Sequence, residues 1–419
     1  MKEINASIIT IGDELLIGQT IDTNSAFIAT ELNKIGIWVK RRVAIGDVKE
    51  EILDALQAES KDCQVIIITG GLGPTADDIT KPTLAEYFKA KMIVDEGVLQ
   101  NVKDIFTRFN RPFTERNAKQ AEVPDACTVL PNKRGTAPGM WFEKEGVIYV
   151  SLPGVPHEMA GLIEDSVIPK LKEKLQLAVV IHRTLLTAGI GESFLADAIA
   201  DFEKTLPAHI KLAYLPAFGM VRLRLTVRSD NAAEAEQEVD RQFEQLTGLV
   251  KQWMVADKDI KIEEVIGSIL KEKSKFMASA ESCTGGYIAH LITSAPGASS
   301  SFKGSVVCYA NEAKENILGV QHDTIVTHGA VSEETIREMI SGVISVMNVD
   351  YAVATSGIMG PNGGTPEKPV GTVWIAVGDK DKTVAKKHFF RYDRKRNIEL
   401  TAHTALNMLR LFILEAEGV

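Results

Sequence analysis

The sequence predicts an α/β protein of three domains, in which two outer α/β domains flank a small α+β domain. The chain has 419 residues, more than one ordinary hydrophobic core accommodates. In both outer parts, apolar segments of strand length alternate with segments of helical periodicity, which is typical of βαβ units with a parallel sheet. Between residues 177 and 252 the pattern changes to alternating strands and a charged amphipathic helix. We expect domains at residues 1–173, 174–256 and 257–419.

The composition is that of an ordinary globular protein, with 45% hydrophobic and 25% charged residues. Its net charge of −9 provides no basic excess to neutralise phosphates, so we expect neither nucleic acid nor a membrane surface as a partner. The four cysteines are far apart and have neither zinc spacing nor the pattern of a disulfide framework. Because no signal peptide and no apolar run of about 18 residues is visible, we expect a cytoplasmic protein.

The N-terminal third alternates predicted strands and helices. Strands are expected at residues 7–11, 39–43 and 65–69, and helices at residues 24–32 and 49–57. In parallel sheets of this kind, ligands bind beyond the carboxyl ends of the strands. The glycine-rich segment 70–80 follows the third strand, where glycines let the backbone approach a phosphate and carboxylates offer oxygen ligands to a divalent cation.

The alternative for segment 70–80 is a glycine-rich turn followed by aspartates that cap a helix. A cap requires one acidic residue, whereas this segment has three glycines and two acidic residues, so we favour a phosphate and metal site. The candidate residues, from loops that follow predicted strands, are Asp13, Glu14, Gly70, Gly71, Gly73, Thr75, Asp77, Asp78, Pro153 and Gly154, with Asp77 and Asp78 as the metal ligands.

The middle part has the pattern of a small α+β module. Strands are expected at residues 179–186, 211–215 and 221–227, and helices at residues 193–203 and 232–246.

In the C-terminal part, the segment from Glu281 to Gly286 lies between an apolar strand, 276–280, and an amphipathic helix that begins near Tyr287. Backbone N–H groups are unpaired where a strand turns into a helix, and the helix dipole there favours anions. A nucleophile such as Ser282 would therefore have an oxyanion site close by. The alternative is that the hydroxyl only caps the helix.

Two later segments supply partners for a serine nucleophile. Residues 306–309 are expected as a strand, and Lys314 follows in a helix. A partly buried lysine with a lowered pKa can serve as the base, and Tyr309 can relay the proton. The alternatives are a solvated helix lysine and an aromatic residue at a strand end.

A second glycine-rich turn follows the predicted strand 351–355 and favours a backbone cradle for a ligand. Its candidate residues are Gly357, Gly360, Gly363, Gly364 and Thr365. Arg394, in a basic cluster beside Tyr392, is a candidate phosphate clamp, although such charge runs are often solvated faces.

The C-terminal motifs, in chain order, are AESCTGG, VVCYANEAK, HGAVSEE, SGIMGPNGGTPEKPVGTVW and DR…NIE. Together they resemble the C-terminal domain of the CinA family, the nicotinamide mononucleotide (NMN) deamidase. The resemblance implies that Ser282 is the nucleophile, that Tyr309 and Lys314 are its partners and that deamidation uses no metal or other cofactor. We place the oxyanion at backbone N–H groups near Thr284, Gly285 and Gly286. Met359 replaces a small residue of the family pattern, and we expect it to narrow the pocket.

The N-terminal motifs ITIGDELLIGQTIDTNS, TGGLGPTADDIT and LPGVPHEM are similar to the MoaB/MogA-type molybdopterin-binding fold as it occurs in CinA proteins. This resemblance implies a metal-dependent ADP-ribose pyrophosphatase that uses a divalent cation, with a functional role for Asp78. The middle part resembles the KH-type domain of CinA proteins. Its segment Gly189-Ile190-Gly191-Glu192 lacks the second glycine of the nucleic-acid-binding G-x-x-G loop and carries an acidic residue, so we expect a spacer or dimer element.

We therefore expect a homodimeric hydrolase of pyridine-nucleotide salvage that binds NMN and ADP-ribose. Two alternatives belong to other functional classes. One is a molybdopterin-binding or transferase protein whose C-terminal half is vestigial. The other is a non-catalytic scaffold associated with competence or DNA damage.

Overall fold

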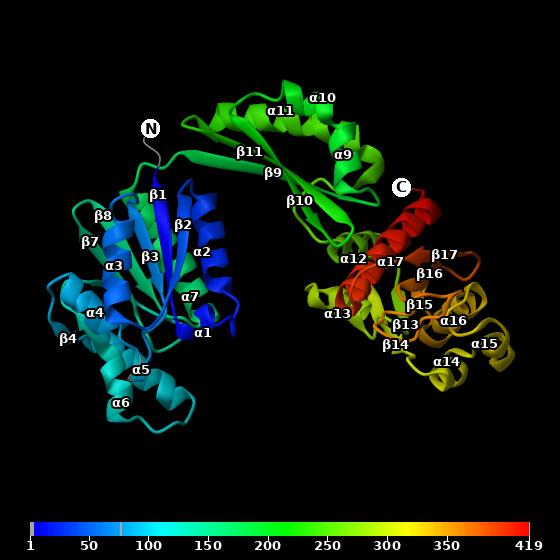
Figure 1. The fold of residues 1–419 in the computed structure, drawn as a ribbon, viewed down its shortest axis with the longest axis horizontal. Coiled ribbons are helices and arrows are strands. Elements are labelled where there is room, and N and C mark those ends of the chain that lie inside the picture. Colours follow the sequence, from blue (N-terminus) through cyan, green and yellow to red (C-terminus); the bar gives the residue numbers. More distant parts are fainter. Residues whose placement is uncertain (1–3, 76–77, 419) are drawn as a thin grey trace. The chain divides into compact units, whose positions relative to one another are not determined.

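The chain divides into two compact units in the computed structural model, which describes residues 4–75 and 78–418 (Figure 1). One unit comprises Met1–Ile181 and Val227–Glu236, and the other comprises His182–Thr226 and Gln237–Val419. Within the described residues, no helix has both the length and the apolar character that crossing a membrane requires.

A six-stranded sheet with the order β2-β1-β3-β8-β7-β6 forms the centre of the first unit. Neighbours among β2, β1, β3 and β8 are parallel, and β7 and β6 continue the sheet in antiparallel pairs. Its strands are β1 (Asn5–Ile11), β2 (Trp38–Ile45), β3 (Val65–Thr69), β6 (Thr128–Leu130), β7 (Gly139–Lys144) and β8 (Val147–Leu152). A separate antiparallel pair consists of β4 (Met92–Val94) and β5 (Glu122–Pro124).

Helices cover both faces of this sheet. The helices of this unit are α1 (Asp13–Leu16), α2 (Thr23–Lys34), α3 (Lys49–Glu59), α4 (Thr80–Tyr87), α5 (Glu96–Arg108), α6 (Glu115–Ala118), α7 (Pro156–Leu162) and α8 (Ile168–Lys174). The strand β3 is buried along its whole length because alternate residues face opposite layers: Ile67 packs with Ile28 of α2, and Ile68 packs with Ile52 of α3. Because β1, β3 and β8 are parallel, their carboxyl ends lie at one edge of the sheet, where the loops that follow them meet.

The middle part forms a four-stranded sheet with the order β10-β11-β9-β12. Its elements are β9 (Val179–Ala188), α9 (Glu192–Ala198), α10 (Ala200–Thr205), β10 (Ile210–Ala217), β11 (Met220–Ser229), α11 (Ala232–Val250) and β12 (Met254–Ala256). The single helix expected at residues 193–203 is divided into α9 and α10 by Ile199, whose φ and ψ of −114° and 12° are not helical.

The C-terminal part contains a five-stranded sheet with the order β14-β13-β15-β16-β17, in which β13 is parallel to β14 and to β15. Its strands are β13 (Met277–Glu281), β14 (Phe302–Val307), β15 (Tyr351–Gly357), β16 (Thr372–Gly378) and β17 (Thr383–Phe389). Its helices are α12 (Ile262–Glu272), α13 (Tyr287–Ser294), α14 (Asn311–Leu318), α15 (His322–His328), α16 (Glu333–Met347) and α17 (Arg394–Glu417).

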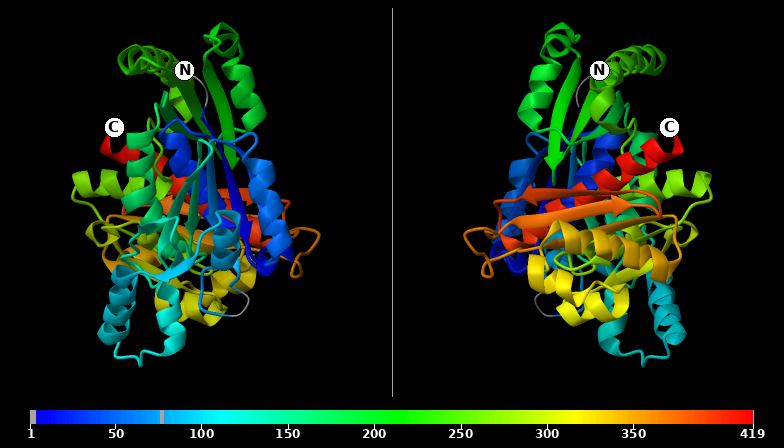
Figure 2. Two further views of the ribbon diagram at one scale, coloured as in Figure 1. Left: turned by 90° about the vertical axis from the view of Figure 1, so that its left-hand side faces the viewer. Right: turned by 90° about the vertical axis from the view of Figure 1, so that its right-hand side faces the viewer.

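The helices α16 and α17 lie on opposite faces of this sheet (Figure 2). In β15, Val353 packs with Leu406 of α17, whereas the adjacent Ala354 packs with Met339 of α16. The carboxyl ends of β13, β14 and β15 meet at one edge, which brings the loops that carry the C-terminal motifs together. The strand expected at residues 306–309 begins earlier and ends at Val307, so Tyr309 belongs to the following loop.

Candidate active site

Ser282 is the first residue after β13, in a tight turn that leads into α13. Its backbone N–H donates to the carbonyl oxygen of Thr355 in the neighbouring strand at 3.0 Å, which fixes the turn to the sheet. The side chain of Ser282 is 8% exposed, and its hydroxyl forms no hydrogen bond with another described residue. The hydroxyl is therefore held in a confined position without being used as a helix cap.

The cap of α13 is instead the carboxylate of Glu281, which is fully buried. It accepts hydrogen bonds from the amides of Gly286, Ile288 and Ala289 at 2.8–3.0 Å and from the hydroxyl of Thr284 at 2.8 Å. Hydroxyls of Ser279 and Ser305 lie 3.2 and 3.3 Å from the same carboxylate. A buried carboxylate is tolerated because the helix dipole and these donors stabilise its charge.

This network changes which amides are available to an oxyanion. The Gly286 amide donates to the carboxylate of Glu281, and the Gly285 amide donates to the carbonyl oxygen of Ser282 at 3.2 Å. The expectation that these two amides bind the oxyanion is therefore wrong, because both already have a partner. Among the described residues, the amides of Cys283 and Thr284 have no such partner. They directly follow Ser282 and are the N–H groups left for a developing negative charge.

Cys283 is adjacent to Ser282 and packs in the hydrophobic core, where it is 4% exposed. Burial raises the pKa of its thiol to about 12. The reactive form of cysteine is the thiolate, which this environment disfavours. The geometry of the turn therefore favours Ser282 over Cys283 as the nucleophile.

Lys314, in α14, is 1% exposed. Its ammonium donates to the carbonyl oxygen of Cys308 at 2.9 Å and to that of Tyr309 at 3.3 Å. Burial lowers the pKa of Lys314 from its ordinary value because the charged form loses hydration. The alternative of a solvated lysine is therefore wrong.

Tyr309 is 62% exposed, and its hydroxyl accepts a hydrogen bond from Arg394 at 3.0 Å. The same guanidinium donates to the carbonyl oxygen of Gly360 at 2.9 Å. The structure thus brings together three of the expected site residues from the β14–α14 loop, the glycine-rich loop and the start of α17. Within the described chain, no hydrogen bond joins the hydroxyl of Tyr309 to Ser282 or to Lys314.

The glycine-rich loop leaves β15 and returns to β16, and it is closed by a 2.7 Å hydrogen bond from the Gly371 amide to the carbonyl oxygen of Ile358. Gly360 and Gly363 have φ values of 84° and 94°, a conformation that side chains disfavour. A Cβ on Gly364 would lie 2.7 Å from the backbone of the returning chain.

Three more residues define this loop. Gly357 is the last residue of β15. The hydroxyl of Thr365 accepts from the Lys368 amide at 3.1 Å, so it supports the turn. Met359 is 3% exposed and packs in the hydrophobic core, and the expectation that it narrows the pocket stays a prediction.

Asn397 is a residue of this site that the sequence analysis overlooked. It is fully buried in α17, and its side-chain amide donates to the carbonyl oxygens of Met359 at 3.3 Å and Tyr392 at 2.9 Å. It therefore ties the glycine-rich loop to the segment that carries Arg394. The only feature of the sequence that could have pointed to Asn397 is its place in the motif DR…NIE.

In the first unit, a cavity of about 440 Å³ lies at the carboxyl ends of the parallel strands. Seven of the expected residues line it, namely Glu14, Gly70, Gly71, Gly73, Asp78, Pro153 and Gly154. Asp13 and Thr75 do not, and Asp77 lies outside the described residues. The chain thus brings together residues about 140 positions apart because β1, β3 and β8 are neighbouring parallel strands.

The carboxylate of Asp78 organises the glycine-rich turn of this cavity. It accepts from the amide of Gly73 at 2.8 Å and from the amide and hydroxyl of Thr75 at 2.9 and 2.5 Å. Thr75 thus contributes by fixing Asp78 in place. Within residues 4–75 and 78–418, no three His, Cys, Asp or Glu side chains form a group that could hold a metal ion by themselves.

The same cavity is also lined by Asp47, Gln120 and Glu158, which the sequence analysis did not select. Glu158 accepts from the side-chain amide of Asn132 at 2.7 Å, and burial raises the pKa of its carboxyl. Its place in the motif LPGVPHEM was the only signal. Asp47 lies in the loop after β2. No motif in the sequence marks this loop as part of the cavity.

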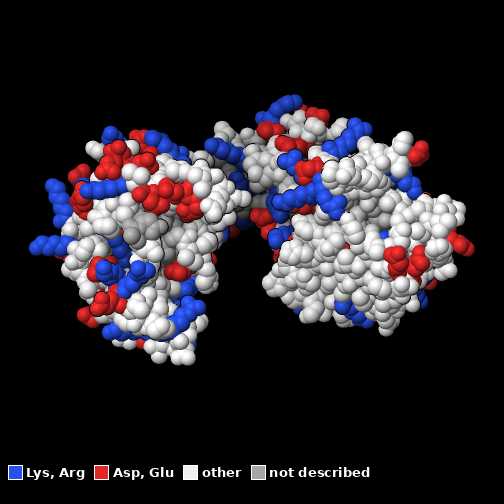
Figure 3. Space-filling view, turned by 60° about the horizontal axis from the view of Figure 1, so that its bottom comes forward, with Lys and Arg blue, Asp and Glu red and all other residues white. Residues whose placement is uncertain are grey.

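Charged residues of both signs are present on the surface, as expected from the 47 basic and 56 acidic residues of the chain. On the face drawn in Figure 3, Lys and Arg alternate with Asp and Glu over the first unit, and a broad area of the unit that contains the C-terminus carries few charges. This face does not form the continuous basic surface that a nucleic-acid backbone requires.

Three family models match consecutive parts of the chain. "Probable molybdopterin binding domain" matches residues 7–173, "Damage-inducible protein CinA KH domain" matches residues 182–256, and "CinA C-terminal domain" matches residues 259–413. These matches confirm the expected fold class, with a MoaB/MogA-like domain, a KH-type domain and a C-terminal α/β domain.

Relatives match the chain over its whole length. The "CinA-like protein" of Cytophaga hutchinsonii is 45% identical over 414 residues, which is 99% of each chain. The protein of the same description from Flavobacterium psychrophilum is 46% identical over 98% of this chain and 99% of its own. A crystal structure of the competence/damage inducible protein CihA from Agrobacterium tumefaciens is 35% identical and covers 36% of this chain and 92% of its own, with a TM-score of 0.35. The chain therefore belongs to the CinA family.

Proposed function

We propose that the C-terminal part hydrolyses the carboxamide of NMN to nicotinate mononucleotide and ammonia. The observation that carries this proposal is the combination of a confined, unbonded hydroxyl on Ser282 with a buried lysine, Lys314, whose pKa is lowered. A serine hydroxyl needs a base to become a nucleophile, and a lysine whose pKa is lowered by burial can act as that base.

In the first step, the oxygen of Ser282 attacks the carboxamide carbon while Lys314 takes the hydroxyl proton. The amides of Cys283 and Thr284 stabilise the oxyanion of the tetrahedral intermediate. The C–N bond then breaks, and the leaving nitrogen takes the proton from Lys314 and departs as ammonia. A water molecule hydrolyses the resulting ester and returns Ser282 to its starting form.

The remaining residues bind and orient the nucleotide. Arg394 carries a guanidinium suited to a phosphate and is held by Gly360 and Tyr309. Because the Tyr309 hydroxyl pairs with Arg394, this arrangement favours a role for Tyr309 in holding the substrate over a role in proton relay. Gly357, Gly363, Gly364 and Thr365 belong to the loop that would follow the ribose phosphate.

The test is ammonia release from NMN by the purified full-length protein, with and without a chelator. We expect release in both conditions because none of these steps uses a metal ion. Equal rates for the wild type and for Ser282→Ala would overturn the proposal.

A second activity, hydrolysis of the pyrophosphate of ADP-ribose, is favoured by the cavity of about 440 Å³ in the first unit. Its glycine-rich turn suits a phosphate, and the carboxylates of Glu14, Asp47 and Asp78 line its wall. Mg²⁺ is commonly held by one or two carboxylates together with substrate phosphates, so this oxygen-rich lining fits such an ion. When bound, the ion would neutralise charge on the pyrophosphate. Production of AMP and ribose 5-phosphate from ADP-ribose in the presence of Mg²⁺ tests this activity.

A further inference from the structure

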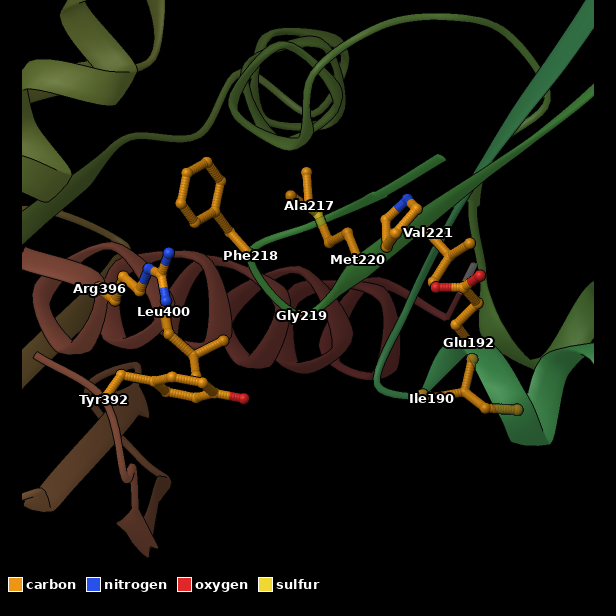
Figure 4. A pocket seen from close by; sticks show the side chains of 12 residues that line it. Ile190, Glu192, Ala217, Phe218, Gly219, Met220, Val221, Tyr392, Arg396 and Leu400 are labelled. Carbon is orange, nitrogen blue, oxygen red and sulfur yellow. The ribbon is translucent and has the colours of Figure 1, made fainter. Parts of the chain in front are cut away.

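The second unit contains a pocket of about 620 Å³ that belongs to neither proposed active site. It lies between the turns of the middle part, at the β9–α9 junction and the tip of the β10–β11 hairpin, and the first turns of α17 (Figure 4). Ligand pockets in proteins typically enclose about 300–1,000 Å³. The size is therefore that of a site for a small molecule.

Two aromatic rings with exposed surface form part of the lining. Phe218 is 46% exposed, and its ring stacks on His403 with centroids 5.3 Å apart and 11° between the planes. Tyr392 is 56% exposed, and its backbone is fixed by two hydrogen bonds with Asn397. Exposed rings on a fixed ring partner or a fixed backbone offer stacking surfaces for a planar ligand.

The charged residues of the pocket lie at its two ends. Figure 4 shows Arg396 of α17 at one end and Glu192 of α9 at the other. The Nε of Arg396 is 3.5 Å from a carboxylate oxygen of Asp393, and the other N–H groups of the guanidinium have no partner among the described residues. A guanidinium in this state binds a phosphate, whereas a carboxylate such as Glu192 repels one and accepts from N–H groups.

We propose that this pocket binds a mononucleotide. Its base would lie against Phe218 and Tyr392, its phosphate would bind Arg396, and an amino group of the base would donate to Glu192. The apolar side chains between the charged ends, Leu400 among them, would exclude water from the base. This inference goes beyond both proposed activities and does not depend on either of them.

The probe for the test is AMP, which has neither a carboxamide nor a pyrophosphate and is therefore consumed by neither proposed reaction. The full-length protein is photolabelled with 8-azido-AMP, and the labelled peptides are identified by mass spectrometry. We expect label on the peptide that carries Phe218, which belongs to neither of the other two sites, and less label when AMP is added in excess. Label confined to the peptides of the other two sites, or no label, would overturn the proposal.

Titration calorimetry with AMP measures the contribution of single residues. We expect Arg396→Gln and Tyr392→Ala each to weaken binding at this site about tenfold. The matched control is Lys395→Gln, which removes the neighbouring positive charge outside the pocket lining and is expected to leave binding unchanged. Leu400→Trp, which fills the pocket, is expected to abolish binding there. Wild-type affinity in both Arg396→Gln and Leu400→Trp would contradict the proposal.

Discussion

The buried ammonium of Lys314 lies 2.9 Å from the carbonyl oxygen of Cys308, to which it donates a hydrogen bond. Its second bond, to the carbonyl oxygen of Tyr309, is 3.3 Å long. A neutral amine has two N–H groups and one lone pair, so it can keep both bonds and still accept a proton. The two carbonyl groups therefore orient the amine of Lys314 also in its neutral form, in which its lone pair can accept a proton.

The first prediction concerns pH. Because burial lowers the pKa of Lys314, the neutral fraction of this residue grows as pH rises through the lowered value. We expect kcat/KM for NMN to fall on acidification and to reach a plateau above that pKa. Initial rates of ammonia release between about pH 5 and 10 measure this profile. A rate that does not change over this range would contradict the assignment.

The second prediction separates the proton acceptor from the positive charge. Lys314→Arg keeps the charge but cannot lose its proton, so we expect deamidation to fall by roughly 10²–10⁴-fold. Lys303→Arg, at an exposed position, is the control and should retain wild-type rates. If Lys314→Arg is as active as this control, Lys314 is not the base.

The third prediction compares neighbouring residues of the turn. Ser282→Ala is expected to remove NMN deamidation with little change in thermal unfolding, because its hydroxyl has no hydrogen-bond partner to lose. Cys283→Ala is expected to retain activity and to lower stability by about 1 kcal/mol, since Cys283 packs in the core. Calorimetric unfolding and ammonia release are measured for both. The reverse pattern of activities would assign the nucleophile to Cys283.

The fourth prediction concerns Glu281, the cap of α13. Glu281→Gln replaces one acceptor oxygen by an NH₂ group that faces N–H donors, so we expect a loss of roughly 2–4 kcal/mol in the free energy of unfolding of the C-terminal part. We also expect weaker deamidation, because the turn that holds Ser282 depends on this cap. The exposed Glu312→Gln is the control, and equal unfolding curves for the two variants would show that the network is dispensable.

The fifth prediction separates the two proposed activities. Asp78→Ala removes the acceptor that fixes Gly73 and Thr75, so we expect ADP-ribose cleavage to be lost. NMN deamidation is expected to remain, because distant sites act nearly independently. A chelator should have the same selective effect. Loss of both activities in Asp78→Ala would mean that the two sites are coupled.

Much of the local structure could be predicted from the sequence. The apolar run before Ser282 and the helical periodicity after Tyr287 are local patterns, and they place the serine in a strand-to-helix turn. The glycines of segment 70–73 likewise mark a turn that follows a buried strand. Such patterns are readable because they depend on the backbone preferences and burial of consecutive residues.

Other features depend on partners that only the fold brings close. Arg394 and Tyr309 are 85 residues apart and meet because the loops after β14 and β15 and the start of α17 lie at one edge of the sheet. Asp47 and Glu158 line the N-terminal cavity for the same kind of reason. No local pattern encodes these pairings, since they follow from strand order.

By itself, the sequence determined the order of strands and helices and the residue types available for chemistry. The tertiary structure decided which of these residues are buried and which groups form hydrogen bonds with them. Glu281 is an example, because beside Ser282 in the sequence it is only an acidic residue at a strand end. Its charge is stabilised inside the protein because β14 and the first turn of α13 supply donors that surround it. That stabilisation requires groups from separate elements at hydrogen-bond distance, a condition that exists only after the chain has folded.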